Sequence, residues 1–479
     1  MEEVFLTIPI LLFLFGGIAL FALKRKAADA LVLIVSGLSL LVDAYGSYKF
    51  LVSSKNIEKI VFYKNNVLGQ VFGLTVDTAS IVMSLLVTIT GFLVFLYSAQ
   101  YMEKSPEESN RKGYLYGWMS IALAASLFSI FSTSLIQTII GLEVMAVSFS
   151  LLVNFYGINK GKGWKLFAVE NLAVVLLLIA LGYTGKSDLF LMNSLSSHEK
   201  ILAFISMLFA AFAMSSQFFF YSWLPDSTQA PIPVSTLLHS VTLVSAGVIF
   251  FLRMVQLMKL PTEAFNLVWP FTVTMLVLMI IYYPIQSDAK KLIAYSTISQ
   301  AAVSYTVISY GILGQQVGIQ IGFYQMINHI VVKAIAFLSV GFFIYHLGTS
   351  DLRKIKGIRT TMPAASVAWF LSFLGLAGVL PLGLFFGKMF TIMSTMHGVG
   401  FTTWLIPSII LIDSGVFFVV VLYWFRDIFF GEIKLTEALA KDLAKPAGLM
   451  IAVVIVFLVI GSVMPWVSLD MVKRIVFLG

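Results

Sequence analysis

The sequence predicts an all-α integral membrane protein, and its composition and its apolar runs both point to that class. Of the 479 residues, 59% are hydrophobic and 11% are charged, and the mean hydropathy is +0.96. A water-soluble chain of this size would not tolerate that composition. Apolar runs near or above the ~20 residues that span a bilayer recur along the chain, which predicts about 14 transmembrane helices. The runs lie at 5–23, 28–51, 76–99, 115–133, 134–156, 165–185, 200–222, 234–258, 266–285, 289–312, 316–347, 363–392, 403–425 and 446–468.

The charges flanking these runs predict an orientation in the cytoplasmic membrane. Glu2 and Glu3 precede the first run, and Lys24, Arg25 and Lys26 follow it, the reverse of a cleaved signal peptide. Most Lys and Arg fall in the loops after odd-numbered runs, which we expect on the cytoplasmic side, with both termini outside. The net charge of +8 is therefore assigned to orientation within the bilayer and not to nucleic-acid binding.

The chain contains no cysteine, which excludes disulfides, thiolate ligation of iron–sulfur clusters and thiol catalysis. The sequence also shows no nucleotide-binding loop, metal-ligand cluster or nucleophile constellation. We therefore expect no cofactor, no metal and no redox chemistry in this chain.

One stretch between two apolar runs predicts an interrupted helix. Residues 223–233 include Pro225, Pro231 and Pro233, and proline both lacks the amide N–H and clashes with the preceding turn. Irregular backbone at membrane depth usually lines a cavity. His239 follows within the next apolar run, where an ionisable group is costly unless it faces a protein interior or a hydrated path.

Several motifs resemble one family in the right order. SSQFFFYSWLPDSTQAPIPVSTLLHSVTLVSAGV is similar to a signature of the antiporter-like membrane subunits that respiratory complex I, Mrp-type cation/proton antiporters and membrane-bound hydrogenase-type complexes share. DAKKLIAYSTISQ, FYQMINHIVVKAIAFLSVGFFIYHLGTSDLRKIKG and LSFLGLAGVLPLGLFFGK resemble later motifs of the same family. The resemblance covers about residues 70–430.

This resemblance implies two inverted five-helix repeats, at 111–260 and 261–430, with broken helices near residues 223–233 and 381. The N-terminal part, 1–110, would hold three helices and an external hairpin or loop at 52–75. The remaining part, 431–479, would hold one C-terminal helix.

The resemblance also implies a path of buried ionisable groups for protons. Its members would be Glu143, in IIGLEVMAVSFSLLV, then His239, His329, Lys333 and Lys388. His329 and Lys333 are four residues apart and share one helix face, so a proton on one changes the affinity of the other. A core histidine and a snorkelling lysine are the alternatives for His239 and Lys333.

The sequence departs from the family at Met214, where the family carries a lysine that partners the glutamate. Methionine holds no charge, so we expect Glu143 to stay largely neutral. Ser215, Ser216 and Gln217 remain as polar groups that could order water.

Other charged residues receive separate interpretations. Asp413 is a candidate partner for Lys388, since pairing lowers the cost of burying both charges. The remaining acids within or beside the runs are taken as helix-end residues near an interface: Asp43, Asp77 and Glu170. Lys290 and Lys291 are taken as cytoplasmic loop charges.

These features imply a subunit of a multi-subunit membrane complex that moves protons, with sodium as a further candidate ion. Other antiporter-like subunits and a redox arm would be its partners in the bilayer. Two alternatives remain: a structural spacer that lost pumping, for which Met214 is the observation, and a subunit of an Mrp-type cation/proton antiporter.

Overall fold

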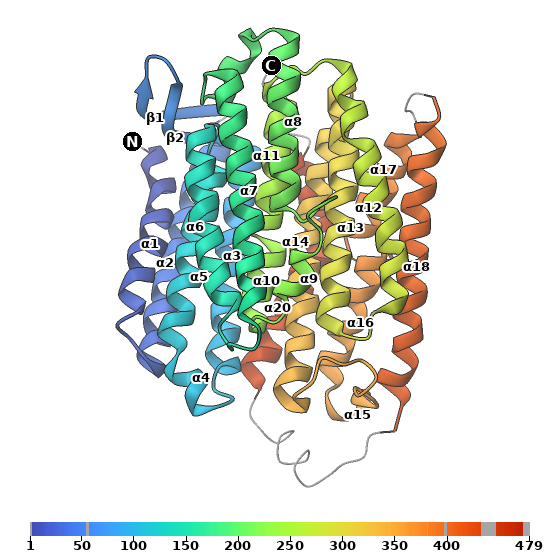
Figure 1. The fold of residues 1–479 in the computed structure, drawn as a ribbon. Helices are drawn as coiled ribbons and strands as arrows, with labels where there is room; N and C mark the ends of the chain where they lie inside the picture. Colours follow the sequence, from blue (N-terminus) through green and yellow to red (C-terminus); the bar gives the residue numbers. More distant parts are fainter. Residues whose placement is uncertain (1, 54–56, 381, 397–399, 433–446, 473–479) are drawn as a thin grey trace.

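The computed structural model describes residues 2–53, 57–380, 382–396, 400–432 and 447–472, and it forms one bundle of roughly parallel and antiparallel helices (Figure 1). The first helices are α1 (Ile8–Leu20), α2 (Arg25–Val52), α3 (Thr78–Tyr101), α4 (Pro106–Asn110), α5 (Lys112–Ile130), α6 (Leu135–Val153), α7 (Lys160–Thr184), α8 (Ser197–Met214), α9 (Trp223–Ser227), α10 (Ile232–Ser240) and α11 (Leu243–Leu257). The later ones are α12 (Trp269–Tyr282), α13 (Ala289–Ser309), α14 (Gln316–Leu347), α15 (Ile358–Thr361), α16 (Pro363–Ala377), α17 (Leu384–Thr395), α18 (Thr402–Phe430) and α20 (Gly448–Val472). Short 3-10 helices are η1 (Glu2–Thr7), η2 (Leu189–Ser194), η3 (Thr262–Leu267), η4 (Tyr283–Ile285) and η5 (Tyr310–Leu313).

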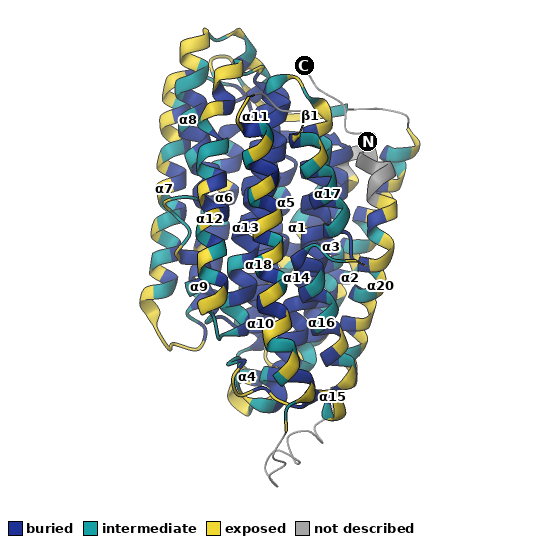
Figure 2. Ribbon diagram, turned by 90° about the vertical axis from the view of Figure 1, so that its right-hand side faces the viewer, coloured by how far each residue is buried: buried dark blue, intermediate teal, exposed yellow. Residues whose placement is uncertain are grey.

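The prediction of an all-α membrane protein is confirmed at the level of fold class. Within the described residues, 11 helical segments are long and apolar enough to cross a bilayer, and two shorter apolar helices are Phe5–Leu20 and Pro363–Ala377. The outward faces of the peripheral helices expose large apolar side chains, whereas the centre of the bundle is buried (Figure 2). Such an apolar exterior is what lipid requires.

Where the sequence predicted a hairpin or loop between 52 and 75, the chain forms an antiparallel β-hairpin. Strand β1 (Ile57–Asn65) pairs with β2 (Gly69–Asp77), and β2 runs directly into α3. The amide of Gly73 donates to Gln137 Oε1 on α6, which ties β2 to the bundle. Figure 1 shows the hairpin and the start of α1 at one end of the bundle, with α4 and α15 at the other.

Local sequence signals explain where several helices begin. Ser134 caps α6 by accepting from the Gln137 amide. Ser196 and Glu199 form a reciprocal capping box at the start of α8, and Asp288 caps α13. Because such side chains satisfy amides that have no partner inside the helix, they mark the first turn of each helix.

The first helix break begins earlier than predicted. The sequence placed it at 223–233, but α8 already ends at Met214, and residues 223–227 form the short helix α9. Ser216 and Phe219 adopt positive φ angles of 58° and 72°, which helix cannot accommodate. Pro225 lies in the first turn of α9, where its missing N–H costs nothing, so this proline marks the start of a helix and not its interruption.

Two further breaks shape the core. Val241 and Thr242 separate α10 from α11 directly after the histidine-containing turn, a break that the sequence analysis missed. In the second half α16 ends at Gly378, whose φ is +79°, and α17 begins at Leu384. The predicted break at residue 381 falls between these helices, but residue 381 itself lies outside the described residues.

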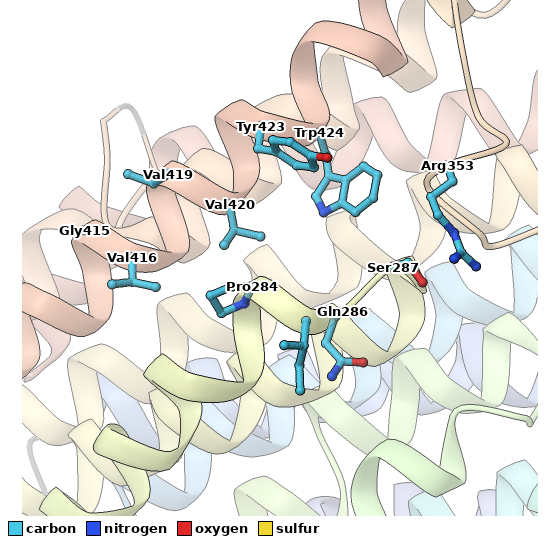
Figure 3. A pocket seen from close by; sticks show the side chains of 11 residues that line it. Pro284, Gln286, Ser287, Arg353, Gly415, Val416, Val419, Val420, Tyr423 and Trp424 are labelled. Carbon is cyan, nitrogen blue, oxygen red and sulfur yellow. The ribbon is translucent and has the colours of Figure 1, made fainter.

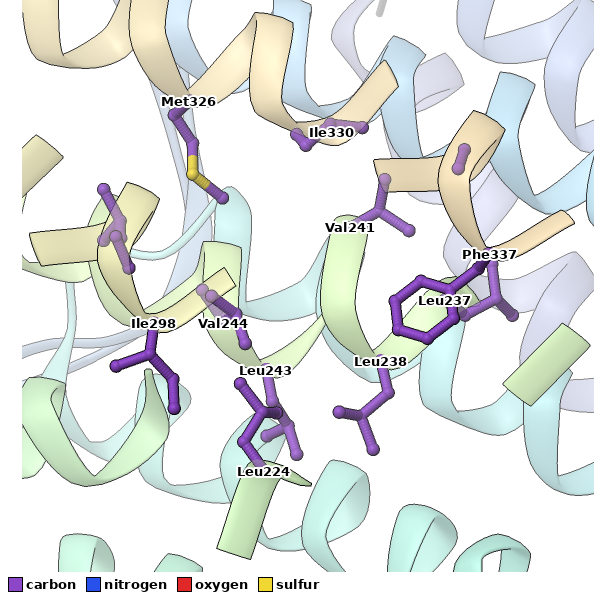
Figure 4. Packing of buried hydrophobic residues seen from close by; sticks show 14 of the residues in the cluster. Leu224, Leu237, Leu238, Val241, Leu243, Val244, Ile298, Met326, Ile330 and Phe337 are labelled. Atoms are coloured by element: carbon purple, nitrogen blue, oxygen red, sulfur yellow. The ribbon is translucent and has the colours of Figure 1, made fainter. Parts of the chain in front are cut away.

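Helix α14 is the centre of the bundle. It packs against α10, α13, α16, α17 and α20. Figure 4 shows the apolar contacts at this centre, where Leu237 and Leu238 of α10 lie near Phe337 of α14, and Leu243 of α11 lies near Leu224 of α9. This apolar packing surrounds the few charged side chains described next.

Candidate functional site

The second half contains a buried lysine and carboxylate in contact. Lys388 Nζ of α17 lies 3.8 Å from Asp413 Oδ2 of α18 and donates to Ser414 Oγ at 2.8 Å. Asp413 also accepts from Ser299 Oγ at 2.8 Å and from Tyr283 Oη at 3.1 Å. The expected partnership of Asp413 with Lys388 is therefore present, and three groups from three elements converge on the Asp413 carboxylate.

The break between α16 and α17 makes room for this lysine. Because α16 ends there, the Leu376 carbonyl has no intrahelical partner and accepts from Lys388 Nζ at 3.3 Å and from Gln300 Nε2 at 3.1 Å. Gly378 lies beside the lysine stem, since a Cβ at this position would stand 2.8 Å from Lys388 Cδ. The broken helix thus supplies both an acceptor and space.

Lys333 lies fully buried on α14 and has no carboxylate partner. Its Nζ donates to the Ile293 carbonyl at 2.7 Å and to Ser296 Oγ at 2.5 Å, both on α13. No described carboxylate lies within 4.0 Å of this ammonium group. A snorkelling lysine is excluded because the side chain has no exposed surface. His329, one turn earlier, is also buried.

His239 occupies the last turn of α10, next to the break at Val241. Its ring packs against Phe337 with 4.7 Å between centroids, and neither ring nitrogen forms a hydrogen bond. The charges of Lys333 and Lys290 both act on this ring. The His329 nitrogens also lack a well-formed hydrogen bond, but this ring lies close enough to the His239 backbone to interact with it.

Lys290 was wrongly taken as a plain loop charge. It lies in the first turn of α13 and donates to the Ala230 carbonyl at 3.1 Å, between α9 and α10. The carbonyl is available because no helix continues through residues 228–231. Nothing in the local sequence distinguishes Lys290 from Lys291, so only the fold identifies it.

Helix α13 connects these groups through one polar face. Ser296 contacts Lys333, Ser299 contacts Asp413, and Gln300 accepts from Gln325 Nε2 of α14 at 2.6 Å. Spacings of three and four residues place these side chains on neighbouring positions of one helix face. The result is a buried polar chain in which α13 connects Lys333 to Gln325, Asp413 and Lys388, with His239 and the partly buried Lys290 within electrostatic reach of its Lys333 end.

The polar residues beside Met214 form hydrogen bonds to backbone carbonyls near the break after α8. Ser215 Oγ contacts the Ala211 carbonyl at 2.6 Å and Tyr305 Oη at 2.8 Å. Gln217 Nε2 donates to the Ser215 and Ile298 carbonyls, and Ser216 Oγ donates to the Tyr221 carbonyl. Their hydrogen-bonding capacity is thus largely used to satisfy carbonyls freed by the break. Met214 itself is fully buried.

Glu143 does not join the buried chain. It is only partly buried and lies on α6 with Ile140 and Val147, which are 39% and 37% exposed. Spacings of three and four residues put all three on one outward face. The expectation of a buried carboxyl is therefore corrected, because α6 turns this side of the helix away from α5 and α7.

The acids interpreted as helix-end residues are mostly deep inside the bundle. Asp43, in the body of α2, accepts from Ser84 Oγ at 3.1 Å and Thr88 Oγ1 at 2.9 Å. Glu170, in the body of α7, is fully buried, and its carboxyl oxygens have no hydrogen-bond partner. Both assignments were wrong. Asp77 fits its assignment, since it caps α3.

Sequence reasoning missed Arg253, which partners Asp77. Arg253 Nη1 donates to Asp77 Oδ2 at 2.5 Å and Nη2 donates to Oδ1 at 2.7 Å. Both side chains are buried, and the arginine lies near the end of α11. In the sequence this arginine resembles an ordinary charge at the end of an apolar run, so no local signal marks it.

An apolar groove of about 610 Å³ lies apart from the polar chain (Figure 3). Pro284 and Gln286 line one side, Val416, Val420 and Trp424 of α18 line the other, and Arg353 lies at one end. It contributes no buried charge. The described residues also contain no group of three His, Asp or Glu side chains that could hold a metal ion.

With this geometry established, comparison with known proteins identifies the family. Residues 132–412 match the model described as NADH:quinone oxidoreductase/Mrp antiporter, TM. The chain belongs to this family. Residues 68–111 also match the N-terminus of complex I chain 5. The chain is 30% identical over 417 residues to the Na(+)/H(+) antiporter subunit A1 of Staphylococcus aureus, covering 80% of this chain and 51% of that protein.

Two solved structures share the fold. A chain of an archaeal membrane-bound sulfane sulfur reductase matches with a TM-score of 0.81 at 18% identity, covering 99% of this chain and 96% of that one. A chain of the Mrp complex from Dietzia sp. matches with a TM-score of 0.81 at 20% identity, covering 97% and 51%. This family member thus spans about half the length of the curated relatives that it matches.

Proposed function

We propose that this chain is an ion-translocating subunit of a multi-subunit membrane complex, and that protons move along its buried polar chain. The observation that carries the proposal is the series of buried ionisable groups around α13 and α14, namely His239, Lys333, Lys388 and Asp413, with the partly buried Lys290 at one end. Buried charges cost free energy that stability alone does not repay, so a functional reason is the default for several in a row. Sodium is a further candidate ion, by analogy with the antiporter relative.

The direction of the path follows from the arrangement of the chain. Asp288, two residues before Lys290, forms a β-bridge with Asp351 in the segment before α15, so Lys290 lies near the bundle end that carries α15. The loops after odd-numbered apolar runs carry most of the Lys and Arg, and the positive-inside tendency makes that end cytoplasmic. We infer that both termini are outside, in the cytoplasmic membrane. Fourteen membrane helices, arranged as two inverted repeats at 111–260 and 261–430, would account for the broken helices in both halves.

The position of Glu143 supports the presence of a partner subunit. A carboxyl group on an outward apolar face is costly against lipid, and a neighbouring protein surface with a donor or cation would remove that cost. We therefore place a membrane partner against the outer face of α6. Other antiporter-like subunits and a redox arm are the candidates, and an Mrp-type assembly is the alternative to a respiratory one.

The test is ion transport by the complete assembly in inverted vesicles, measured together with the turnover that drives it. Lys388→Ala removes the lysine that contacts Asp413, and we expect it to lower the number of ions transported per turnover, because the path through this subunit then lacks one proton-carrying group. Lys186→Ala, at the bundle surface between α7 and η2, is the control and should transport normally. An unchanged ratio in an assembled Lys388→Ala complex would show a structural spacer.

A further inference from the structure

The first half encloses a small cavity beside Met214. It lies between α5, α6, α8 and α11, and its polar lining comes from Ser129, Ser132, Thr138 and Arg253. Its volume is about 10 Å³. Roughly 10–15 Å³ is the smallest space that holds one water molecule. The cavity is therefore just large enough for a single water.

Two of the residues that line this cavity each have a buried polar atom without a protein partner. Ser129 Oγ and Arg253 Nε are both buried, and neither forms a hydrogen bond. A buried donor without a partner is destabilising, and native proteins rarely leave two such groups around one space. A water with donors and acceptors on opposite sides satisfies both at once.

Arg253 places a positive charge in the part of the fold where Met214 has none. The two residues line the same cavity from α11 and α8. The guanidinium is held by both oxygens of Asp77 and by Gln256 Oε1 at 3.3 Å, so its position is set by three acceptors. Bidentate pairing of this kind fixes orientation as well as charge.

We propose that this cavity is a water-binding site, and that Arg253, held by Asp77, supplies the positive charge of the first half in place of a lysine at position 214. A guanidinium keeps its proton under all ordinary conditions. The cation of the first half, the Arg253 guanidinium, is therefore fixed in place beside a water molecule, and it does not release a proton to a relay. This last step rests on the proposed function, because it takes the proton path to run through His239, Lys333 and Lys388 and not through Arg253.

A charge exchange in the complete complex tests the assignment. Met214→Lys adds a second cation beside Arg253 with one carboxylate nearby, so we expect a lower thermal midpoint and loss of assembled complex. Met214→Lys combined with Arg253→Met restores one cation and one carboxylate, and should recover most of that loss. If Met214→Lys alone is tolerated as well as the double variant, Arg253 does not occupy the role proposed.

A second measurement needs no variant. A high-resolution map of the wild-type complex should show density for one water within hydrogen-bonding distance of Ser129 Oγ and Arg253 Nε, and Ser129→Ala should weaken that density. An empty cavity in the wild-type map overturns the water site. Neither measurement depends on transport, so failure here and failure of Lys388→Ala in vesicles are distinguishable.

Discussion

The two halves of this protein bury their charges in different ways. In the second half Lys388 Nζ lies 3.8 Å from Asp413 Oδ2 and donates hydrogen bonds to Ser414 Oγ and to the Leu376 carbonyl. In the first half the Arg253 guanidinium donates two hydrogen bonds, of 2.5 and 2.7 Å, to the Asp77 carboxylate. A flexible ammonium with several alternative acceptors can change partners, whereas a bidentate guanidinium is held in one orientation.

On the proposed function, this difference lets one fold hold a charge that moves and a charge that does not. The broken helix α16–α17 provides a free carbonyl for Lys388, and Gly378 leaves room for the lysine stem. The break after α8 is satisfied by its own residues, since Ser216 and Gln217 donate to the Tyr221 and Ser215 carbonyls. Broken helices therefore do not by themselves make a path, because the side chains near the break decide what the backbone can bind.

The largest effect on stability is expected when the mobile pair is broken on one side. Asp413→Ala leaves Lys388 buried without a carboxylate and removes the acceptor of Ser299 and Tyr283. Losing one partner of a buried pair costs about 3–5 kcal/mol. Thermal unfolding of the purified complex measures this loss.

The matched control replaces both partners. Lys388→Met with Asp413→Leu removes the pair and fills the space with apolar atoms, which is often nearly neutral. We expect the double variant to be clearly less destabilised than Asp413→Ala while transport is lost, because Ser299 and Tyr283 still lose their acceptor but no unpaired ammonium group remains buried. Equal destabilisation by the single and double variants would mean that the pair stabilises the fold by its packing and not by the attraction between its charges.

An intermediate effect is expected at the glycine that ends α16. Gly378→Ala must adopt a φ of +79°, which costs an L-residue about 1–2 kcal/mol, and its Cβ also meets the stem of Lys388. Gly314→Ala is the control, since Gly314 has a φ of +83° and no atom within 4 Å of its added Cβ. In thermal unfolding, both variants should be less stable than the wild type by the cost of placing alanine at a positive φ. Only Gly378→Ala should also lower the number of ions transported per turnover. Equal transport in the two variants would argue against a need for space beside Lys388.

The sequence motifs singled out charges of the second half that the structure buries, His329, Lys333 and Lys388, because these charges sit in long motifs with fixed spacing. His329 and Lys333 share a helix face by spacing alone, and Asp413 was a recognisable candidate partner for Lys388. Contacts between residues far apart in the chain could not be predicted from the sequence, because no motif or spacing marks them. Arg253 and Asp77 are 176 residues apart, and Lys290 reaches Ala230 across 60 residues.

Orientation around a helix axis was the other information that the sequence could not supply. Helix α6 is apolar on all sides, so periodicity does not show that Glu143 faces outward. The same reason hid the burial of Asp43 and Glu170, since mostly apolar helices α2 and α7 do not reveal which face meets protein. The prolines near the first break were also ambiguous, because proline at a first helical turn and proline inside a helix look alike in a sequence.

The smallest effect on stability is expected at Lys333, and it separates function from folding most clearly. Lys333→Met removes a buried cation that has no carboxylate partner, and its two acceptors stay satisfied because Ser296 Oγ already donates to the Ile293 carbonyl at 2.9 Å. Methionine has a similar length and no desolvation cost, so the unfolding free energy should stay unchanged or rise by about 1–2 kcal/mol. Transport should nevertheless be lost, since methionine carries no proton between His239 and Lys388. Thermal unfolding and vesicle transport on one preparation measure both. A stable variant that still transports would place the proton path outside α14, and the second half would then hold its charges as statically as the first.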